Sequence, residues 1–579
     1  MIEPRVYRAA FIPALLAIVL AMFSFQSRPR PLPQGLAADV LFDGNQAADT
    51  AAELAQEEPD RRAGSAGDRA TAALAGDAFR RAGFAVESQR FERDGYELEN
   101  VIARRAGRSR SQIAIVAARD AATVPEASGS ASDTAALLEL SRVFRGRPSR
   151  RTLVLASVDG STLGDVGMEE LTAELGPPSL VEAVLVVSDL GSASRSGSFA
   201  QAWSNDSERV GIGLQRTVVE SIREEVDEPV GGTGALAQLA RLSFPIGIGG
   251  QGVLLEAGYD AVRISGSGEL PPGGNGPVEA IDEDRLGALG RAALRTVTAL
   301  DQHGRPEHGP DAYVVVVSQV LPGWAVTLLG GTLLLPALVA SLDAFARIRR
   351  RRLPVLSWLR MVGAWSAPFL AGFAVAEVLV LAGATPSPPP APVPPAELPL
   401  DGPALAALGA VALTMALALA LGRFLASRPD PVLRDPVAPG AAVVLALAVT
   451  VGALLLWLIN PYAGLLAVPA AHLWMIAVLT RPVPKRGVRT LMIAAGLLPA
   501  LLVALYYLVA LSIDPLEGAW YLLMLVTGHT VGLPTVLVAC LLLAGLAGVI
   551  EVTVRLPEEP RDEEPERGVR GVVESATQS

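Results

Sequence analysis

Apolar residues follow different patterns in the two halves of this chain. Up to about residue 311, apolar runs are short and alternate with polar, acidic or glycine-rich stretches, apart from one continuous run at 9–25. Beyond residue 311 each run is long enough for a helix to cross a ~30 Å hydrocarbon core, which takes about 20 residues. These runs are 320–345, 361–384, 403–425, 440–459, 461–480, 489–512 and 519–550. Together with 9–25, they predict eight membrane spans.

The last run is long for one span and is interrupted by glycine and proline. It contains Gly528-His529-Thr530 and Gly532-Leu533-Pro534. Irregular backbone at membrane depth is tolerated where protein or water covers it. The sequence therefore predicts a broken helix or a re-entrant start between 519 and 550.

Arginine placement predicts how the spans are oriented. The loops after the second, fourth and sixth spans are basic, whereas the alternate loops contain no Lys or Arg. The basic residues are Arg347, Arg349, Arg350, Arg351, Arg352, Arg423, Arg428, Arg434, Arg481, Lys485, Arg486 and Arg489. Short cytoplasmic loops carry the excess of Lys and Arg, so both termini are expected in the cytoplasm and residues 26–319 outside.

This orientation divides the chain into six segments. Residues 1–8 are expected in the cytoplasm, 9–25 form a signal anchor or a cleaved signal peptide, and 26–34 form a linker. Residues 35–311 form the outer domain, 320–550 the membrane domain of seven further spans, and 555–579 a charged, disordered cytoplasmic tail.

The outer domain has the pattern of an α/β fold. Three apolar runs at 113–117, 152–158 and 183–187 each end in small and acidic residues, which is typical of parallel strands with a site at their carboxyl ends. A further strand is expected at 209–214. Helical periodicity is present at 47–56, 70–82, 134–144, 215–225, 235–242 and 282–300.

Composition narrows the class of protein. An apolar fraction of 51% is too high for a soluble protein of 579 residues and indicates an integral membrane protein. The formal net charge of −11 argues against a nucleic-acid partner. Lys485 is the only lysine, and the abundance of Arg, Ala, Gly and Pro favours a GC-rich bacterial genome, hence a bacterial plasma membrane.

Short motifs in the outer domain resemble the M28 family of zinc aminopeptidases. Arg62-Ala63-Gly64-Ser65 is similar to an early Arg-x-Gly-Ser of that family, and Glu99-Asn100-Val101-Ile102-Ala103 to its Asn-Val-Ile-Ala strand. The resemblance covers about 49–301 and implies a mostly parallel sheet flanked by helices, joined here to an all-α transmembrane bundle. The layout is also similar to endoplasmic-reticulum-type membrane metallopeptidases and to the peptidase-like subunit of the GPI transamidase.

The resemblance implies a degenerate metal site. The family's first histidine ligand and its supporting aspartate correspond to Ala118 and Asp120, and its metal-bridging aspartate corresponds to Gly129. Its paired glutamates, a base and a ligand, correspond to Ser161 and Thr162, and only Asp189 matches a ligand directly. The late loop that would carry the last histidine, 270–276, has none. No zinc cofactor and no catalytic residue are therefore predicted.

The residue inventory leads to the same expectation. The four histidines, His303, His308, His472 and His529, lie outside the peptidase-like core, and so does the single cysteine, Cys540. A catalytic zinc site needs about three nitrogen, thiolate or carboxylate ligands. Carboxylates alone could hold magnesium or calcium, and the candidates are Asp120, Asp133, Asp159, Asp165 and Asp189. Capping and surface roles are the alternative, and Asp133 is expected to cap the helix at 134–144.

Three polar residues fall inside predicted spans. Glu377, His472 and His529 lie in the third, sixth and eighth spans. Polar groups at this depth are costly and are default candidates for a proton or ion path. The alternative is that the histidines bond neighbouring helices and that Glu377 reaches the outer surface.

Three functions remain open at this point. The leading hypothesis is a non-catalytic recognition or assembly module that binds a peptide, lipid-linked or protein partner. The first alternative is an active M28-type membrane metallopeptidase with a rearranged metal site, for which Asp120 and Asp189 are weak metal candidates. The second alternative is a transporter with an accessory outer domain.

Overall fold

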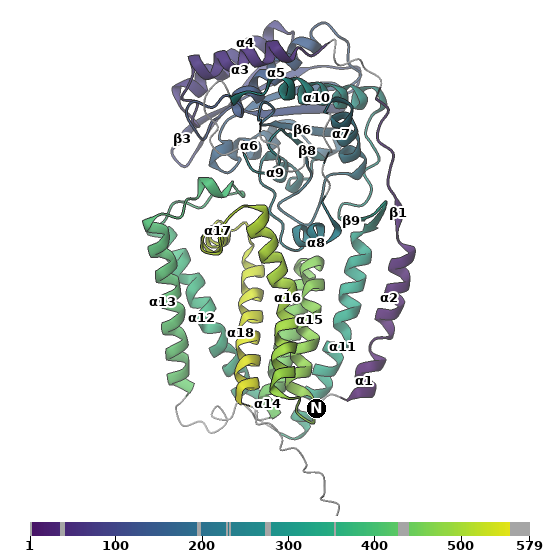
Figure 1. Cartoon of the computed structure of the whole chain (residues 1–579), viewed down its shortest axis with the longest axis vertical. Helices are drawn as coiled ribbons and strands as arrows, with labels where there is room; N and C mark the ends of the chain where they lie inside the picture. The colour runs from purple at the N-terminus through teal and green to yellow at the C-terminus, as the bar shows by residue number, and fades with distance from the viewer. Residues whose placement is uncertain are drawn as a thin grey trace, which may run out of the picture.

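The chain forms two stacked parts, an α/β domain and a bundle of long helices below it (Figure 1). The computed structural model describes residues 3–34, 41–193, 199–226, 230, 233–271, 280–352, 355–426 and 439–555. The predicted tail beyond 555 and most of the 270–276 loop lie outside the described residues.

The α/β domain is built on a seven-stranded mixed sheet with the order β2-β3-β5-β4-β6-β8-β7. Its four central strands are parallel, with Ile115 of β4 opposite Leu155 of β5 and Leu185 of β6. The other pairings are antiparallel, so the sheet is mixed rather than mostly parallel. The strands are β2 (Ala85–Arg93), β3 (Tyr96–Arg105), β4 (Gln112–Ala118), β5 (Thr152–Val158), β6 (Val181–Ser188), β7 (Ala200–Gln201) and β8 (Ala261–Ser265).

Helices cover both faces of this sheet, which explains why its central strands are continuous apolar runs. Helices α3, α4, α5 and α10 lie on the upper face in Figure 1, and α6 and α9 lie on the face toward the bundle. The helices are α3 (Gly44–Glu57), α4 (Ala66–Arg81), α5 (Ser130–Phe144), α6 (Val166–Leu175), α7 (Ile212–Glu225), α8 (Ala235–Ser243), α9 (Gly250–Glu256) and α10 (Glu283–His303).

The strand expected at 209–214 is wrong. Arg209 makes only an isolated bridge with Trp203, and Ile212 already begins α7. The alternation that suggested a strand ends there, because the buried positions Leu214, Val218 and Ile222 follow a helical spacing.

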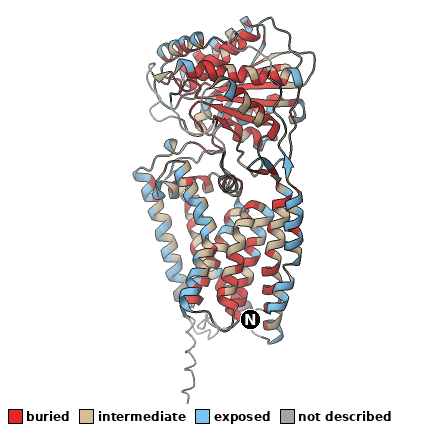
Figure 2. Cartoon of the chain, turned by 45° about the vertical axis from the view of Figure 1, so that its right-hand side comes forward, coloured by how far each residue is buried: buried red, intermediate tan, exposed pale blue. Residues whose placement is uncertain are grey.

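Eight helices among the described residues are long and apolar enough to cross a membrane, which suggests a multi-pass membrane protein. Figure 2 shows buried residues along the centre of the bundle and exposed residues along its outer helices. The helices of this part are α1 (Pro4–Ala9), α2 (Ile12–Phe23), α11 (Gly323–Arg350), α12 (Val355–Leu381), α13 (Gly402–Ala426), α14 (Pro439–Ile459), α15 (Pro461–Leu479), α16 (Arg486–Ala510), α17 (Pro515–Thr527) and α18 (Leu533–Arg555).

The last apolar run is broken, as its glycines and prolines predicted. Helix α17 begins with a capping box formed by Asp514 and Glu517 and ends at Gly528, and it lies across the upper end of the bundle in Figure 1. His529 follows with a positive φ of 59° and is exposed. His529 therefore lies in the turn between α17 and α18 and not within a helix, as the sequence prediction of an eighth span had placed it.

The two parts are joined by a small sheet and by side-chain contacts. Strand β1 (Gln26–Ser27) pairs with β10 (Gln319–Pro322), and β10 pairs with β9 (Tyr313–Val316). The two segments that connect the helical bundle to the α/β domain, one after α2 and one before α11, are therefore hydrogen-bonded to each other. Asn460, between α14 and α15, donates from Nδ2 to the carbonyl oxygen of Leu242 at 2.8 Å. The outer domain therefore rests directly on the upper end of the bundle.

Candidate functional site

The candidate site is formed by the loops that follow β4, β5 and β6 at the carboxyl edge of the parallel strands, and we call it the strand-end site. It contains every residue that the family resemblance singled out, from Ala118 to Asp189. Asp120, Asp165 and Asp189 are all nearly buried, with 3%, 6% and 6% of their surface exposed. The topology thus brings together carboxylates that are far apart in the sequence.

Asp120 is held by four hydrogen bonds from the next loop. Its Oδ1 accepts from the backbone N–H and the hydroxyl of Ser161 at 3.0 and 2.7 Å. Its Oδ2 accepts from the backbone N–H and the hydroxyl of Thr162, both at 2.8 Å. The two residues that stand where the family has glutamates therefore act as donors to Asp120 and satisfy both of its oxygens.

Glu126 occupies the space that a side chain at position 129 would need. A Cβ atom on Gly129 would lie 1.9 Å from Glu126 Oε1 and 3.2 Å from Asp189 Oδ1. Glu126 Oε1 also accepts from the backbone N–H of Ser130 at 2.9 Å. Burial raises the pKa of Glu126 to about 7, and the nearby Asp189 contributes to the increase. The carboxyl group of Glu126 therefore lies beside position 129, where the family has the carboxyl group of an aspartate.

The turn at Asp189 is held by the carboxylate of Asp133 and by two serine hydroxyls. Asp189 has a φ of 53°, and its Oδ2 accepts from the hydroxyls of Ser267 at 2.8 Å and Ser188 at 3.0 Å. Asp133 accepts the backbone N–H groups of Asp189 at 2.9 Å and Leu190 at 3.0 Å. The predicted capping role of Asp133 is wrong, because α5 begins at Ser130 and the carboxylate of Asp133 instead fixes the turn after β6.

A buried ion cluster lies behind the first loop. Arg119 is fully buried, and its Nη2 lies 2.8 Å from Asp68 Oδ2 and 3.5 Å from Asp159 Oδ2. Its Nη1 donates to the carbonyl oxygen of Ser157 at 3.0 Å. Burial raises the pKa of Asp68 to about 8 although Arg119 opposes this. Asp159 therefore has a structural partner and does not face the other carboxylates alone.

Arg263 on β8 supplies positive charge to the site. It is 5% exposed and donates to the carbonyl oxygen of Glu269 at 2.9 Å. Burial raises the pKa of Asp165 to about 7, and Arg263 lowers it in turn. Burial also raises the pKa of Asp189, against the hydrogen bond from Ser267 and the charge of Arg263. Burial thus raises the pKa values of Asp165 and Asp189, and the Arg263 guanidinium opposes the increase at both.

Residues 385–400, between α12 and α13, cover this site, and we call them the covering segment. A Cβ atom on Gly164 would lie 2.7 Å from Pro390 and 3.0 Å from Pro389. The hydroxyl of Tyr521 on α17 donates to the carbonyl oxygen of Val393 at 2.8 Å and holds the segment from below. In Figure 1 the segment runs from the top of α13 along the underside of the α/β domain.

Glu397 of the covering segment faces the carboxylates of the outer domain. Burial raises its pKa to about 8, and Asp165, Asp120 and Glu126 add to the increase, in that order. Its Oε2 is buried and has no hydrogen-bond partner in the described part of the chain. Carboxyl groups from both parts of the protein therefore meet at the strand-end site.

The side chains present do not fit the zinc that the family resemblance implies. Both oxygens of Asp120 are engaged by Ser161 and Thr162, and Asp189 Oδ2 accepts from two hydroxyls. Within the described residues, no group of three or more His, Cys, Asp or Glu side chains has the spacing of a metal centre. The donor set is oxygen only, whereas catalytic zinc sites use histidine, thiolate and carboxylate combinations.

The solved structures similar to this chain cover a little under half of it. No family model and no curated protein matches the chain. Among solved structures, a glutaminyl cyclase from Porphyromonas gingivalis is 16% identical and has a TM-score of 0.35, covering 45% of this chain and 98% of its own. The zinc aminopeptidase BSAP from Bacillus subtilis is 14% identical with a TM-score of 0.35, covering 46% and 95%. These values carry no inference about activity.

Two of the polar residues predicted inside spans, His472 and Glu377, are at least partly buried in the helical bundle. His472 lies midway along α15, and its Nε2 is 2.8 Å from the carbonyl oxygen of Leu333, which can only accept. Nε2 therefore carries the proton, and Nδ1 accepts from the hydroxyl of Tyr7 at 2.7 Å. Glu377 lies near the upper end of α12, and its Oε1 is buried without a hydrogen-bond partner in the described part of the chain.

Sequence reasoning did not single out Glu126, Arg263, Ser267 or Glu397 as residues of the site. Glu126 lies three residues before Gly129, and alignment to the family pattern pointed to Gly129 instead. Ser267 follows β8 by two residues, where the general rule for strand ends could have found it. Glu397 lies in a proline-rich loop of the membrane domain, and no sequence signal places it opposite Asp165.

Proposed function

We propose that this chain is a multi-pass membrane protein whose outer domain is a non-catalytic recognition or assembly module. The observation that supports this most is the engagement of Asp120 by Ser161 and Thr162. These residues stand where an M28-type enzyme has its base and a metal ligand, and here they are hydrogen-bond donors. A peptide, lipid-linked or protein partner is the class of ligand that such a domain would recognise.

The covering segment refines this proposal. Since Pro389 and Pro390 rest on Gly164, a partner that reaches the strand-end site must displace residues 385–400. Those residues connect α12 and α13, so partner binding at the site would be coupled to two helices of the bundle. Such coupling suits a component of a larger membrane assembly.

The proposed topology has both termini on the cytoplasmic side of the plasma membrane. It rests on the basic residues that follow α11, α13 and α15 in the sequence. The C-terminal end of α15 and the N-terminal end of α16 lie away from the α/β domain, because Asn460 and Tyr507, at the other ends of these helices, contact that domain. Single cysteines at Arg350 and Ala396 in a Cys540→Ala background test it with a membrane-impermeant maleimide in intact cells. Labelling of Ala396→Cys alone is expected, and labelling of Arg350→Cys would reverse the orientation.

Native mass spectrometry of the full-length protein, released gently from its own membrane, tests the proposed function. A mass equal to the chain plus another protein or a lipid supports the recognition module. Bound divalent metal that is lost in Asp189→Asn, but kept in the exposed control Asp49→Asn, would overturn it in favour of the metallopeptidase alternative. Hydrolysis of aminopeptidase substrates that depends on Asp189 would have the same consequence.

A further inference from the structure

The edge of the sheet opposite the strand-end site carries a cluster of arginines. Two loops lie side by side there, 106–111 between β3 and β4 and 145–151 between α5 and β5. Their backbones are hydrogen-bonded, with Arg108 N 3.2 Å from Ser149 O and Ser109 N 2.7 Å from Arg150 O. Exposed arginines of the two loops are Arg108, Arg110, Arg145, Arg147 and Arg150.

These five arginines make a local positive surface on a chain whose net charge is −11. None of the five forms an ion pair with another described residue, in contrast to Arg142, which pairs with Glu139 nearby. An unpaired cluster of one sign attracts mobile ions of the opposite sign. The cluster therefore points to an anionic ligand.

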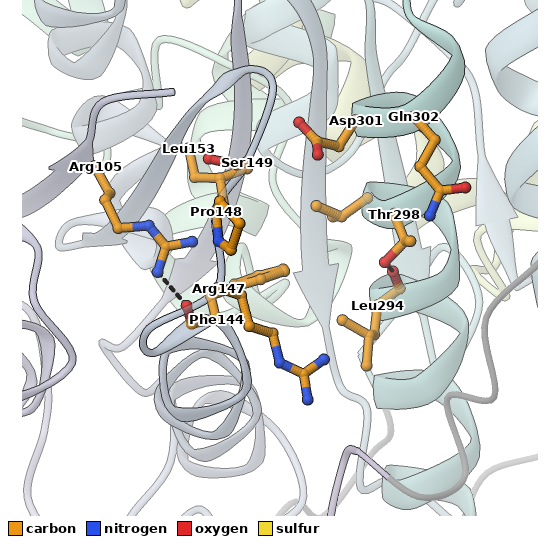
Figure 3. Close-up of a pocket in the computed structure, with 11 residues that line it drawn as sticks. Arg105, Phe144, Arg147, Pro148, Ser149, Leu153, Leu294, Thr298, Asp301 and Gln302 are labelled. Atoms are coloured by element: carbon orange, nitrogen blue, oxygen red, sulfur yellow. Dashed lines mark hydrogen bonds between the residues drawn. The ribbon is translucent and has the colours of Figure 1, made fainter. Parts of the chain in front are cut away.

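A pocket of about 140 Å³ lies between these loops and α10 (Figure 3). In Figure 3, Arg105 reaches from the end of β3 toward Pro148 and Ser149, and Arg147 extends toward α10. The only carboxylate in the lining is that of Asp301, whose oxygens accept the backbone N–H groups of Arg150 at 3.1 Å and Arg151 at 2.7 Å. Two guanidinium groups against one engaged carboxylate leave the lining positive.

Arg105 packs against two aromatic rings in the pocket wall and has one buried nitrogen without a hydrogen-bond partner in the described part of the chain. Its guanidinium carbon lies 4.9 Å from the ring centre of Phe84 and 6.0 Å from that of Phe144, and its Nη1 donates to the carbonyl oxygen of Phe144. Its Nη2 and the hydroxyl of Ser149 are buried without hydrogen-bond partners in the described part of the chain. Unsatisfied buried donors are costly, and burial lowers the pKa of Arg105.

We propose that this pocket binds a phosphate group. A guanidinium offers a fork of donors that matches phosphate oxygens, and Arg105, Arg147 and the Ser149 hydroxyl would approach a tetrahedral anion from different directions. The volume is well below the roughly 300–1,000 Å³ of pockets for drug-sized ligands, so the pocket suits a small anion such as free phosphate or a phosphoryl head group. This site lies at the opposite edge of the sheet from the strand-end site and does not depend on the proposed function.

Thermal unfolding of the full-length protein in detergent tests the site, with inorganic phosphate titrated against sodium chloride at equal ionic strength. A ligand that binds the folded state raises the unfolding temperature in a concentration-dependent way. Arg147→Gln is expected to weaken the apparent affinity for phosphate about tenfold, since one charge-assisted interaction is lost. Ser149→Ala should weaken it less, and Arg81→Gln, an exposed arginine on α4, is the matched control.

A second arm uses dihexanoyl phosphatidic acid, which is soluble and carries the same phosphoryl group. Stabilisation by both probes assigns the site to free phosphate, and stabilisation by the lipid alone assigns it to a head group. Arg105→Lys keeps the positive charge but loses the forked guanidinium donors. The variant should therefore fold, and it should bind phosphate more weakly than the wild type does. Equal stabilisation by chloride, or equal phosphate affinity in wild type, Arg147→Gln and Arg105→Lys, would overturn the proposal.

Discussion

The contact between the covering segment and the outer domain should open as pH rises, and Glu397 should be the main cause. With the covering segment in place on the outer domain, which we call the closed arrangement, Glu397 is repelled by Asp165, Asp120 and Glu126. Its pKa is raised from an ordinary 4.5 to about 8. A carboxyl group with a raised pKa stabilises the closed arrangement fully below its ordinary pKa, and this contribution is lost as pH rises through about 8.

The size of the effect follows from the pKa change. One pKa unit corresponds to about 1.4 kcal/mol, so the full change corresponds to ~5 kcal/mol. Glu397 keeps part of its surface exposed, and solvent screening reduces this to roughly 2 kcal/mol. That free energy changes the ratio of closed to open protein about 30-fold between pH 4.5 and about pH 8.

Distances between spin labels measure the opening directly, and the labels themselves do not titrate. Ser387→Cys and Glu92→Cys, both exposed, are labelled in a Cys540→Ala background. One short distance is expected near pH 4.5, with a longer population growing in as pH rises toward 8. Glu397→Gln should suppress most of that growth, while Glu517→Gln, at the start of α17, should not. The same pH response in Glu397→Gln, or no response in wild type, would refute the reasoning.

Three further predictions concern stability, each measured by chemical or thermal unfolding of the full-length protein. Asp120→Asn leaves hydroxyl and backbone donors without a charged acceptor and should lower the free energy of unfolding by about 1–3 kcal/mol; no loss would mean that those four bonds contribute little. Arg119→Met leaves Asp68 buried and unpaired and should cost about 3–5 kcal/mol, unless Asp68 is already neutral, which a pH-independent small loss would reveal. Tyr7→Phe should cost about 1 kcal/mol, and His472→Ala should cost more because it also removes the bond to the Leu333 carbonyl oxygen. Their double variant should cost no more than His472→Ala, because the bond between the two side chains is already lost in either single variant.

Local pattern was enough to predict most elements of this fold. The strand expected at 152–158 is β5 with the same bounds. The helix expected at 282–300 is α10, which begins one residue later, at Glu283. Eight apolar helices and the break in the last run also follow from composition and from glycine and proline. The strand expected at 209–214 failed because Val210, Ile212 and Leu214 alternate over too short a stretch to separate a strand from the start of a helix.

The site was harder to predict because its bonds join residues that are distant in sequence. Asp133 was expected to cap its own helix, since an apolar run begins one residue later. Its partner is instead the turn at Asp189, which becomes a neighbour only once β4 and β6 pair in parallel. Glu397 meets Asp165 only through the stacking of two separate parts of the protein. Neither contact has a local signature.

The losses that the sequence predicts at the strand-end site are linked in the folded protein. Position 129 has no side chain, and Glu126 fills that space, so an aspartate introduced at Gly129 would collide with it. Ser161 and Thr162 have become donors to Asp120, so glutamates at those positions would leave Asp120 without two of its hydrogen bonds and bring like charges together. Restoring one family residue therefore creates a new conflict. The hydrogen bonds of the strand-end site should therefore stabilise the fold in its present form. Single substitutions toward the M28 pattern should lower the free energy of unfolding and should not restore metal binding.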